Sequence, residues 1–193
     1  MNSNPKLQPS WFLVTAALFY LAFWIQTDWT IEDGMIVARV ARNFATYGVL
    51  SYNTTSWVSS CTSTLFAFIV GLLALIGIPP LIAAKIIGIS AALMGGWILY
   101  KAALRVQCPC HASITAGIYM LLPPTVAYAT CGLETPFYTL ACMVALFSIP
   151  CKSPQIALTA GAIAAIIRPD GLLALLIVIM GIWWRKNSFA CAG

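Results

Sequence analysis

Residues 81–103 read LIAAKIIGISAALMGGWILYKAA, and this stretch decides the fold class. Only Lys85 and Lys101 are charged, and the rest of the stretch is apolar or small. As an α-helix it is long enough to cross the hydrocarbon core of a bilayer, which is about 30 Å thick and needs roughly 20 apolar residues. The stretch therefore predicts a transmembrane helix.

The composition of the whole chain extends this interpretation. Of its 193 residues, 61% are hydrophobic and only 8% are charged, and the mean hydropathy is +0.92. A soluble domain carries about a quarter charged residues, so this chain lacks the polar side chains to cover its surface. Because backbone groups in lipid must bond within the chain, long apolar runs form helices. We expect an all-α integral membrane protein.

The apolar stretches around residues 81–103 predict the topology. They cover residues 11–25, 64–78, 112–130, 133–150, 155–167 and 171–184. The stretch at 64–78 is short for a span and suits a half-embedded segment. If it does not cross, the others form about six transmembrane helices with both chain ends inside, and six bases lie on the cytosolic face, as the positive-inside rule requires. Those bases are Lys6, Lys101, Arg105, Lys152, Arg185 and Lys186.

The same topology gathers the acids on the outer face. The polar residues 26–63 form the first outer loop, and residues 1–193 form a single transmembrane domain. Ionisable groups near membrane depth are costly and commonly functional. We therefore expect one polar mouth on the outer face, built from Asp28, Glu32, Asp33, Arg39, Arg42, Glu134, Arg168 and Asp170.

An amphipathic helix is predicted inside the first outer loop. Thr30 followed by Asp33 fits a helix N-cap with a capping-box-like acid. An apolar face would rest on the membrane surface, formed by Met35, Ile36, Val40 and Phe44. On the local sequence alone, an ordinary capped interfacial helix with solvated charges is the favoured interpretation of this pattern.

Four short motifs occur in order along the chain. They are EDGMI at 32–36 with Arg39 and ARN at 41–43, Tyr47-Gly48 with the Ser/Thr-rich residues 56–64, GLETP at 132–136, and RPDG at 168–171. Together they resemble motifs of polytopic glycosyltransferases of the GT-C superfamily, which use polyprenyl-phosphate-linked sugars, such as mannosyl- and arabinosyltransferases. The chain departs from that pattern at Glu32, where many members have Asp, and at Met35, which replaces an aromatic residue.

The resemblance implies sugar transfer on the non-cytosolic face of the plasma membrane, from a polyprenyl-phosphate donor to a hydroxyl of a glycan, lipid or protein. Asp33 is the expected general base, with Glu32 as second choice. A positioned base contributes about 10²–10⁴-fold, and arginine or lysine suits the departing phosphate. Arg39, Arg42, Lys85 and Arg168 are candidate phosphate or sugar contacts, and Glu134 and Asp170 candidates to orient Arg168 or bind the sugar.

Simpler explanations exist for several of these residues. Lys85 near a span end can snorkel to the interface, and Glu134 and Asp170 can cap helices. The seven cysteines, including Cys108-Pro109-Cys110, show no zinc spacing, and His111 has no histidine partner. We therefore predict no definite cofactor and leave a divalent metal open. The net charge of +5 forms no basic patch, so no nucleic-acid partner is expected.

Two other classes of function fit the composition. A transporter or channel subunit also has clustered charges and helices broken by glycine and proline, but its ionisable groups normally lie near the bilayer midplane. An inactive fragment is the second alternative. Because enzymes of the resembled superfamily are commonly longer, we expect this chain to be the N-terminal part of a larger enzyme.

Overall fold

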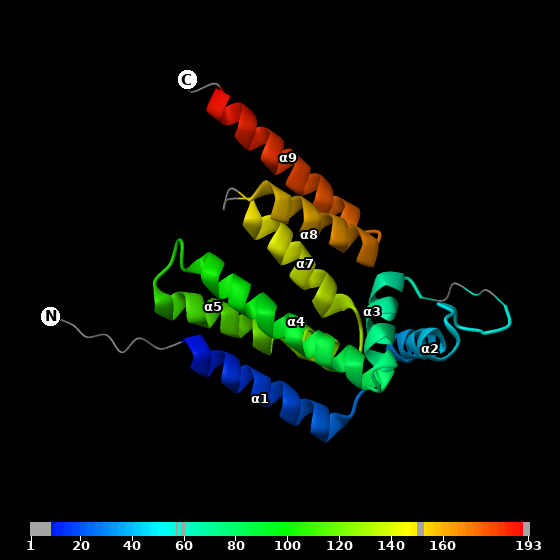
Figure 1. Ribbon diagram of the computed structural model, residues 1–193. Coiled ribbons are helices and arrows are strands. Elements are labelled where there is room, and N and C mark those ends of the chain that lie inside the picture. Colours follow the sequence, from blue (N-terminus) through cyan, green and yellow to red (C-terminus); the bar gives the residue numbers. More distant parts are fainter. Residues whose placement is uncertain (1–8, 57, 59–60, 150–152, 191–193) are drawn as a thin grey trace.

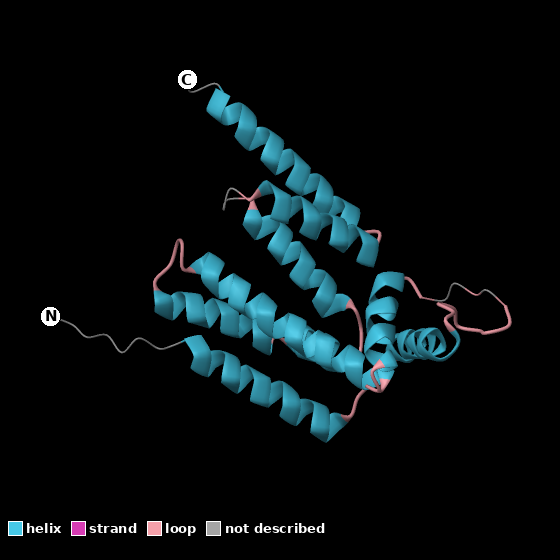
Figure 2. Ribbon diagram, viewed as in Figure 1, coloured by secondary structure: helices cyan, strands magenta, loops and turns pink. Residues whose placement is uncertain are grey.

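The computed structural model describes residues 9–56, 58, 61–149 and 153–190. All regular secondary structure in these ranges is α-helical (Figure 2). The helices are α1 (Pro9–Thr27), α2 (Glu32–Tyr47), α3 (Thr64–Leu75), α4 (Pro80–Ala103), α5 (Pro109–Leu121), α6 (Pro123–Thr130), α7 (Thr135–Ser148), α8 (Pro154–Ile167) and α9 (Gly171–Ala190).

Helix α4 confirms that residues 81–103 form one long apolar helix. It is continuous over 24 residues and begins with Pro80 in its first turn, where a missing N–H costs nothing. Among the described residues, α4 alone is long and apolar enough to cross a membrane by itself. At most three spans result if each of two bent helix pairs counts as one span. The six predicted crossings therefore stay a prediction.

The bent pairs mark places where the chain changes direction. The axes of α1 and α2 differ by 93°, and those of α6 and α7 by 118°. Helices α3 and α8 and the segment Gly171–Arg185 of α9 are apolar but shorter than a full span. Helix α3 has 12 residues, or about 18 Å at 1.5 Å per residue. This length agrees with a segment that does not cross, although its half-embedded position stays a prediction.

The prediction of one continuous helix over residues 112–130 was wrong. Two prolines, Pro123 and Pro124, divide this stretch into α5 and α6. The residue before a proline is driven out of the helical region, and Leu122 has a ψ of 129°. The prolines also lack the N–H groups that would bond to the preceding turn. The Tyr20 hydroxyl compensates by donating to the freed Met120 carbonyl oxygen at 2.6 Å.

The helices form a bundle with one distinctive end (Figure 1). Helices α1, α4 and α5 lie side by side, and α7, α8 and α9 form a neighbouring row. At one end α2 and α3 lie across the bundle, near the end of α1, the start of α4, the α6–α7 loop and the α8–α9 turn. The α4–α5 loop, the start of α1 and the end of α9 lie at the opposite end.

This arrangement separates the charges. The predicted outer acids belong to the end that carries α2 and α3, whereas Lys101 and Arg105 lie at the opposite end with the α4–α5 loop. Arg185 also lies toward that end, because it donates to the Ile149 carbonyl oxygen just after α7. Lys6, Lys152 and the side chain of Lys186 lie outside the described residues. Which end faces the cytosol stays a prediction.

Helix α2 packs on α3 and α4 through a shared apolar core. Val37, Val40 and Ala41 of α2 are buried with Phe66 and Val70 of α3 and with Ala83 and Ala84 of α4. The predicted membrane-facing apolar face is divided: Val40 packs into the protein core instead, whereas Met35 is 57% exposed. The predicted cap was wrong, because Ile31 is the N-cap residue and forms no side-chain cap bond. Helix α2 is therefore rotated about its axis relative to the predicted orientation. The close approach of Gly34 to the Cys131 carbonyl explains this rotation, since it turns the face of Gly34 and Val37 inward.

The predicted topology can be tested with native cysteines. Cys108 and Cys110 are exposed at the end opposite α2. If that end is cytosolic, an impermeant maleimide will not label them in intact cells but will label them after permeabilisation. A Thr54→Cys variant, exposed in the loop after α2, should show the reverse pattern in a background without the other cysteines. Strong labelling of Cys108 in intact cells would overturn the orientation.

Candidate functional site

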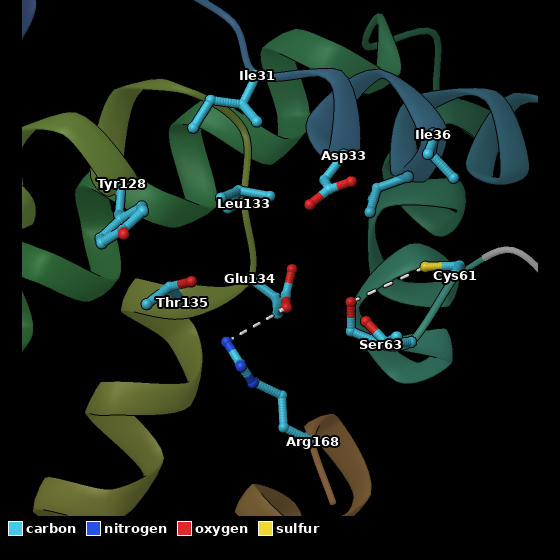
Figure 3. A pocket seen from close by; sticks show the side chains of 12 residues that line it. Ile31, Asp33, Ile36, Cys61, Ser63, Tyr128, Leu133, Glu134, Thr135 and Arg168 are labelled. Atoms are coloured by element: carbon cyan, nitrogen blue, oxygen red, sulfur yellow. Dashed lines mark hydrogen bonds and ion pairs between the residues drawn. The ribbon is translucent and has the colours of Figure 1, made fainter. Parts of the chain in front are cut away.

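A cavity of about 490 Å³ opens at the end of the bundle that carries α2 and α3 (Figure 3). Three separate parts of the chain supply its charged side chains: Asp33 from the start of α2, Glu134 from the loop before α7, and Arg168 from the end of α8. The rest of its wall is formed by Ile31, Ile36, Val37, Cys61, Thr62, Ser63, Tyr128, Leu133 and Thr135.

Asp33 reaches this cavity because α2 lies directly against the α6–α7 loop. A Cβ atom on Gly34 would lie 2.7 Å from the Cys131 carbonyl oxygen, closer than real Cβ contacts allow. Only glycine therefore permits this approach of helix and loop. The preceding residue, Asp33, is in the first turn of α2, and its carboxylate points into the cavity (Figure 3).

Glu134 is held on the opposite side of the cavity. The loop turns at Gly132, whose φ of 89° is a backbone conformation that favours glycine. Glu134 is buried, and its backbone carbonyl accepts the Tyr138 N–H at 2.9 Å in the first turn of α7. Burying a carboxylate requires a compensating partner, and Arg168 supplies one.

Arg168 lies between two acids. Its Nη1 atom is 3.8 Å from Glu134 Oε1, and its Nε donates to Asp170 Oδ1 at 3.2 Å. The guanidinium also lies 5.5 Å from the ring centre of Tyr138. Arg168 has extended backbone angles at the end of α8, as expected for a residue before proline. Because its side chain remains 37% exposed, the guanidinium can still meet an anion that enters the cavity.

The turn after Arg168 leaves no room for a side chain. A Cβ atom on Gly171 would lie 2.2 Å from the Ala164 carbonyl oxygen and 2.3 Å from its carbonyl carbon. Both contacts are with backbone, which cannot rotate away. Gly171 therefore allows α9 to begin directly beside the last turn of α8, and this packing fixes the turn that presents Arg168 and Asp170.

The loop before α3 closes the third side of the cavity with hydroxyl and thiol groups. The Cys61 sulfur lies 3.9 Å from Ser63 Oγ. Burial raises the pKa of the Cys61 thiol, and the negative charges of Glu134 and Asp33 raise it further. Both carboxylates thus act on the same thiol. In the sequence, only the Ser/Thr-rich composition of residues 56–64 points to this wall, and no motif marks Cys61 or Ser63 individually.

The other predicted site residues lie outside the cavity wall. Glu32 is exposed beside Asp33, and Arg42 is exposed on α2. Arg39 holds the following loop: its Nε donates to the Tyr52 carbonyl oxygen at 3.2 Å, and its guanidinium lies 4.2 Å from the Tyr52 ring centre. The substrate contacts of these residues stay predictions.

Lys85 is buried in an ion pair, and its predicted contact with the donor phosphate stays a prediction. It is 1% exposed, which excludes snorkelling, and its ammonium pairs with Asp28 Oδ1 at 3.2 Å. The cavity wall does not include Lys85.

Within the described ranges, no group of three or more His, Cys, Asp or Glu side chains has the arrangement of a metal site.

The class of protein follows from these features. The chain is an all-helical protein with apolar helices and a polar cavity at one end of the bundle, holding two carboxylates and an arginine.

The comparison with known proteins is more specific. The chain is 26% identical, over an alignment 205 residues long, to a terminal β-(1→2)-arabinofuranosyltransferase of Mycobacterium tuberculosis. This match indicates similarity to glycosyltransferases and association with membranes. The alignment covers 92% of this chain but 32% of the relative, so the chain spans about a third of that protein's length. No family model and no solved structure matches the chain.

Proposed function

We propose that this chain is the catalytic N-terminal part of a GT-C-type membrane glycosyltransferase that moves a sugar from a polyprenyl phosphate to an acceptor hydroxyl on the non-cytosolic face. The supporting observation is that Asp33, Glu134 and Arg168, far apart in the sequence, line one cavity. The name of the mycobacterial relative adds an arabinofuranosyl group as the candidate sugar.

Asp33 acts as the general base in this proposal. It accepts the proton of the acceptor hydroxyl while the hydroxyl oxygen bonds to the anomeric carbon, and the bond from that carbon to the phosphate oxygen breaks. The lipid phosphate leaves with the electron pair, so the anomeric configuration inverts. Asp33 lies in the first turn of α2, and its carboxylate points into the cavity (Figure 3).

Arg168 binds the donor phosphate. Its guanidinium offers paired donors to phosphate oxygens, and it is partly exposed at the cavity. Asp170 and Glu134 keep the guanidinium oriented through contacts of 3.2 and 3.8 Å. As negative charge develops on the leaving phosphate, a fixed cation stabilises the transition state.

The transporter alternative receives less support. The cavity and its charges lie at one end of the bundle, with α2 and α3, whereas transporter sites commonly lie near the midplane. Surface chemistry on a lipid head group fits this position better than passage of a solute between the helices.

Arg168→Met tests the assignment of the donor site. Loss of one charge-assisted bond costs about 1.5–3 kcal/mol, so donor affinity should fall roughly tenfold to a hundredfold. The measurement is binding of a polyprenyl-phosphate-linked arabinofuranose to the purified full-length protein. Lys101→Met is the control, since Lys101 lies over the Trp97 ring at the opposite end of α4. Unchanged affinity in Arg168→Met would remove Arg168 from the donor site.

A further inference from the structure

The ion pair of Asp28 and Lys85 lies outside the cavity, and neither the proposed base nor the donor contacts use it. Lys85 is almost completely buried, and its ammonium lies 3.2 Å from Asp28 Oδ1 and 5.6 Å from the ring centre of Trp24. It occupies the second turn of α4 and is buried there. A buried charge in such a place needs its counterion.

Asp28 forms the corner between α1 and α2. Its N–H donates to the Trp24 carbonyl oxygen at 2.9 Å, which completes the last turn of α1. Its φ of 40° is the one positive value among the non-glycine residues that the structure describes. Aspartate tolerates the left-handed conformation better than most residues. From this corner the chain turns by 93° into α2, and Asp33 follows within the first turn of that helix.

The first turns of α4 also hold the loop that carries Glu134. A Cβ on Gly132 would lie 3.2 Å from Leu81, so the loop packs on the first turn of α4. One α4 turn beyond Lys85, a Cβ on Gly88 would lie 2.6 Å from the Ala129 carbonyl oxygen, so α6 packs there closely. Lys85 lies between these two contacts, on the same helix. One short stretch of α4 therefore fixes both the loop of Glu134 and the corner that leads to Asp33.

We infer that the Asp28–Lys85 ion pair is a positioning device that holds the start of α2 in register with the α6–α7 loop, so that Asp33 faces Glu134 and Arg168 across the cavity. Lys85 touches no substrate in this role. The inference rests on the proposed function, because the geometry it preserves is that of the base and the donor site.

The first test separates positioning from donor binding by kinetics. Lys85→Met and Asp28→Asn, made in the full-length protein, should each lower kcat by about 10- to 100-fold, since a misplacement of about 1 Å costs on this order. The KM for a polyprenyl-phosphate-linked arabinofuranose should stay within about twofold. Lys85→Arg keeps the ion pair and should recover most of the rate. A raised donor KM with unchanged kcat would overturn the inference and make Lys85 a donor ligand.

A double-variant cycle adds a second test. If Lys85 acts only through Asp33, Lys85→Met should cost less than about threefold when Asp33 is already Asn, because interacting groups are non-additive. A full additional loss in that background would show a separate role and overturn the inference. Asp33→Asn alone tests the proposed base, so active Asp33→Asn protein removes Asp33 from that role whatever Lys85 does.

Cysteine labelling provides a readout independent of transfer. Cys61 borders the cavity and packs against the core beneath α2. Release of the α1–α2 corner should speed its reaction with maleimide by about tenfold in Asp28→Asn, whose asparagine still tolerates the left-handed backbone. Lys101→Met is the matched lysine control and should leave the rate unchanged. An unchanged Cys61 rate in both Asp28→Asn and Lys85→Met would overturn the inference even if Lys85→Met were poorly folded.

Discussion

Asp33→Asn is expected to lower sugar transfer by about 10²-fold or more in the full-length protein while donor binding survives. The substitution keeps size and polarity but removes the proton acceptor, and a general base contributes about 10²–10⁴-fold. Because Ile31 rather than Thr30 precedes the helix, and no side-chain cap bond is present there, Asp33 does not act as part of a capping box. The measurement is kcat with a polyprenyl-phosphate-linked arabinofuranose, together with donor affinity by equilibrium binding.

Glu32→Gln is the internal control for that experiment. Glu32 is adjacent in sequence and shares the first turn of α2, but its exposed side chain is not part of the cavity wall. It should change transfer by less than about threefold, since it loses only a screened surface charge. Near-normal transfer by Asp33→Asn with a large loss in Glu32→Gln would exchange the two roles. If both variants retain transfer, Asp28 becomes the next candidate base.

Much of the fold could be predicted because it depends on local composition. The helix over residues 81–103 was recovered to within a residue at its start, since an apolar run of this length has few alternatives. The break within 112–130 coincides with Pro123-Pro124, but hydropathy alone does not reveal it, because the apolar character of the stretch continues through the two prolines. The rotation of α2 was not predictable from periodicity, since a tertiary contact between Gly34 and the Cys131 carbonyl decides which face turns inward.

The candidate site also has features that the sequence predicts and features that it does not. The order of the apolar stretches along the sequence predicts that the acids gather at one end of the bundle. The structure brings two of them, Asp33 and Glu134, to one cavity together with Arg168. The partner of Lys85 did not follow, because Asp28 is 57 residues away in the chain and no local pattern links them. Charge pairing of this kind depends on how helices pack, and a single sequence carries no direct record of it.

The packing of the turn that holds Arg168 can be tested by comparing alanine substitutions at two glycines of α9, Gly171 and Gly181. Gly171→Ala should destabilise the protein by about 1–3 kcal/mol, as overpacking against rigid surroundings does, because the added Cβ would lie 2.2 Å from the Ala164 carbonyl oxygen. Relief requires α9 to move away from α8, and that movement displaces Arg168 and Asp170. Donor affinity should therefore fall together with stability.

Gly181→Ala supplies the matched control within α9. Its added Cβ would lie 3.2 Å from Ile149 Cδ1, the tip of a side chain that can rotate. Alanine also favours the helix over glycine by about 1 kcal/mol, so Gly181→Ala should be neutral or mildly stabilising. Thermal unfolding in detergent, followed by helical circular dichroism, compares the two variants, and donor binding is measured on the folded fraction. Equal stability and equal donor affinity in both would show that the α8–α9 turn does not hold Arg168 in place.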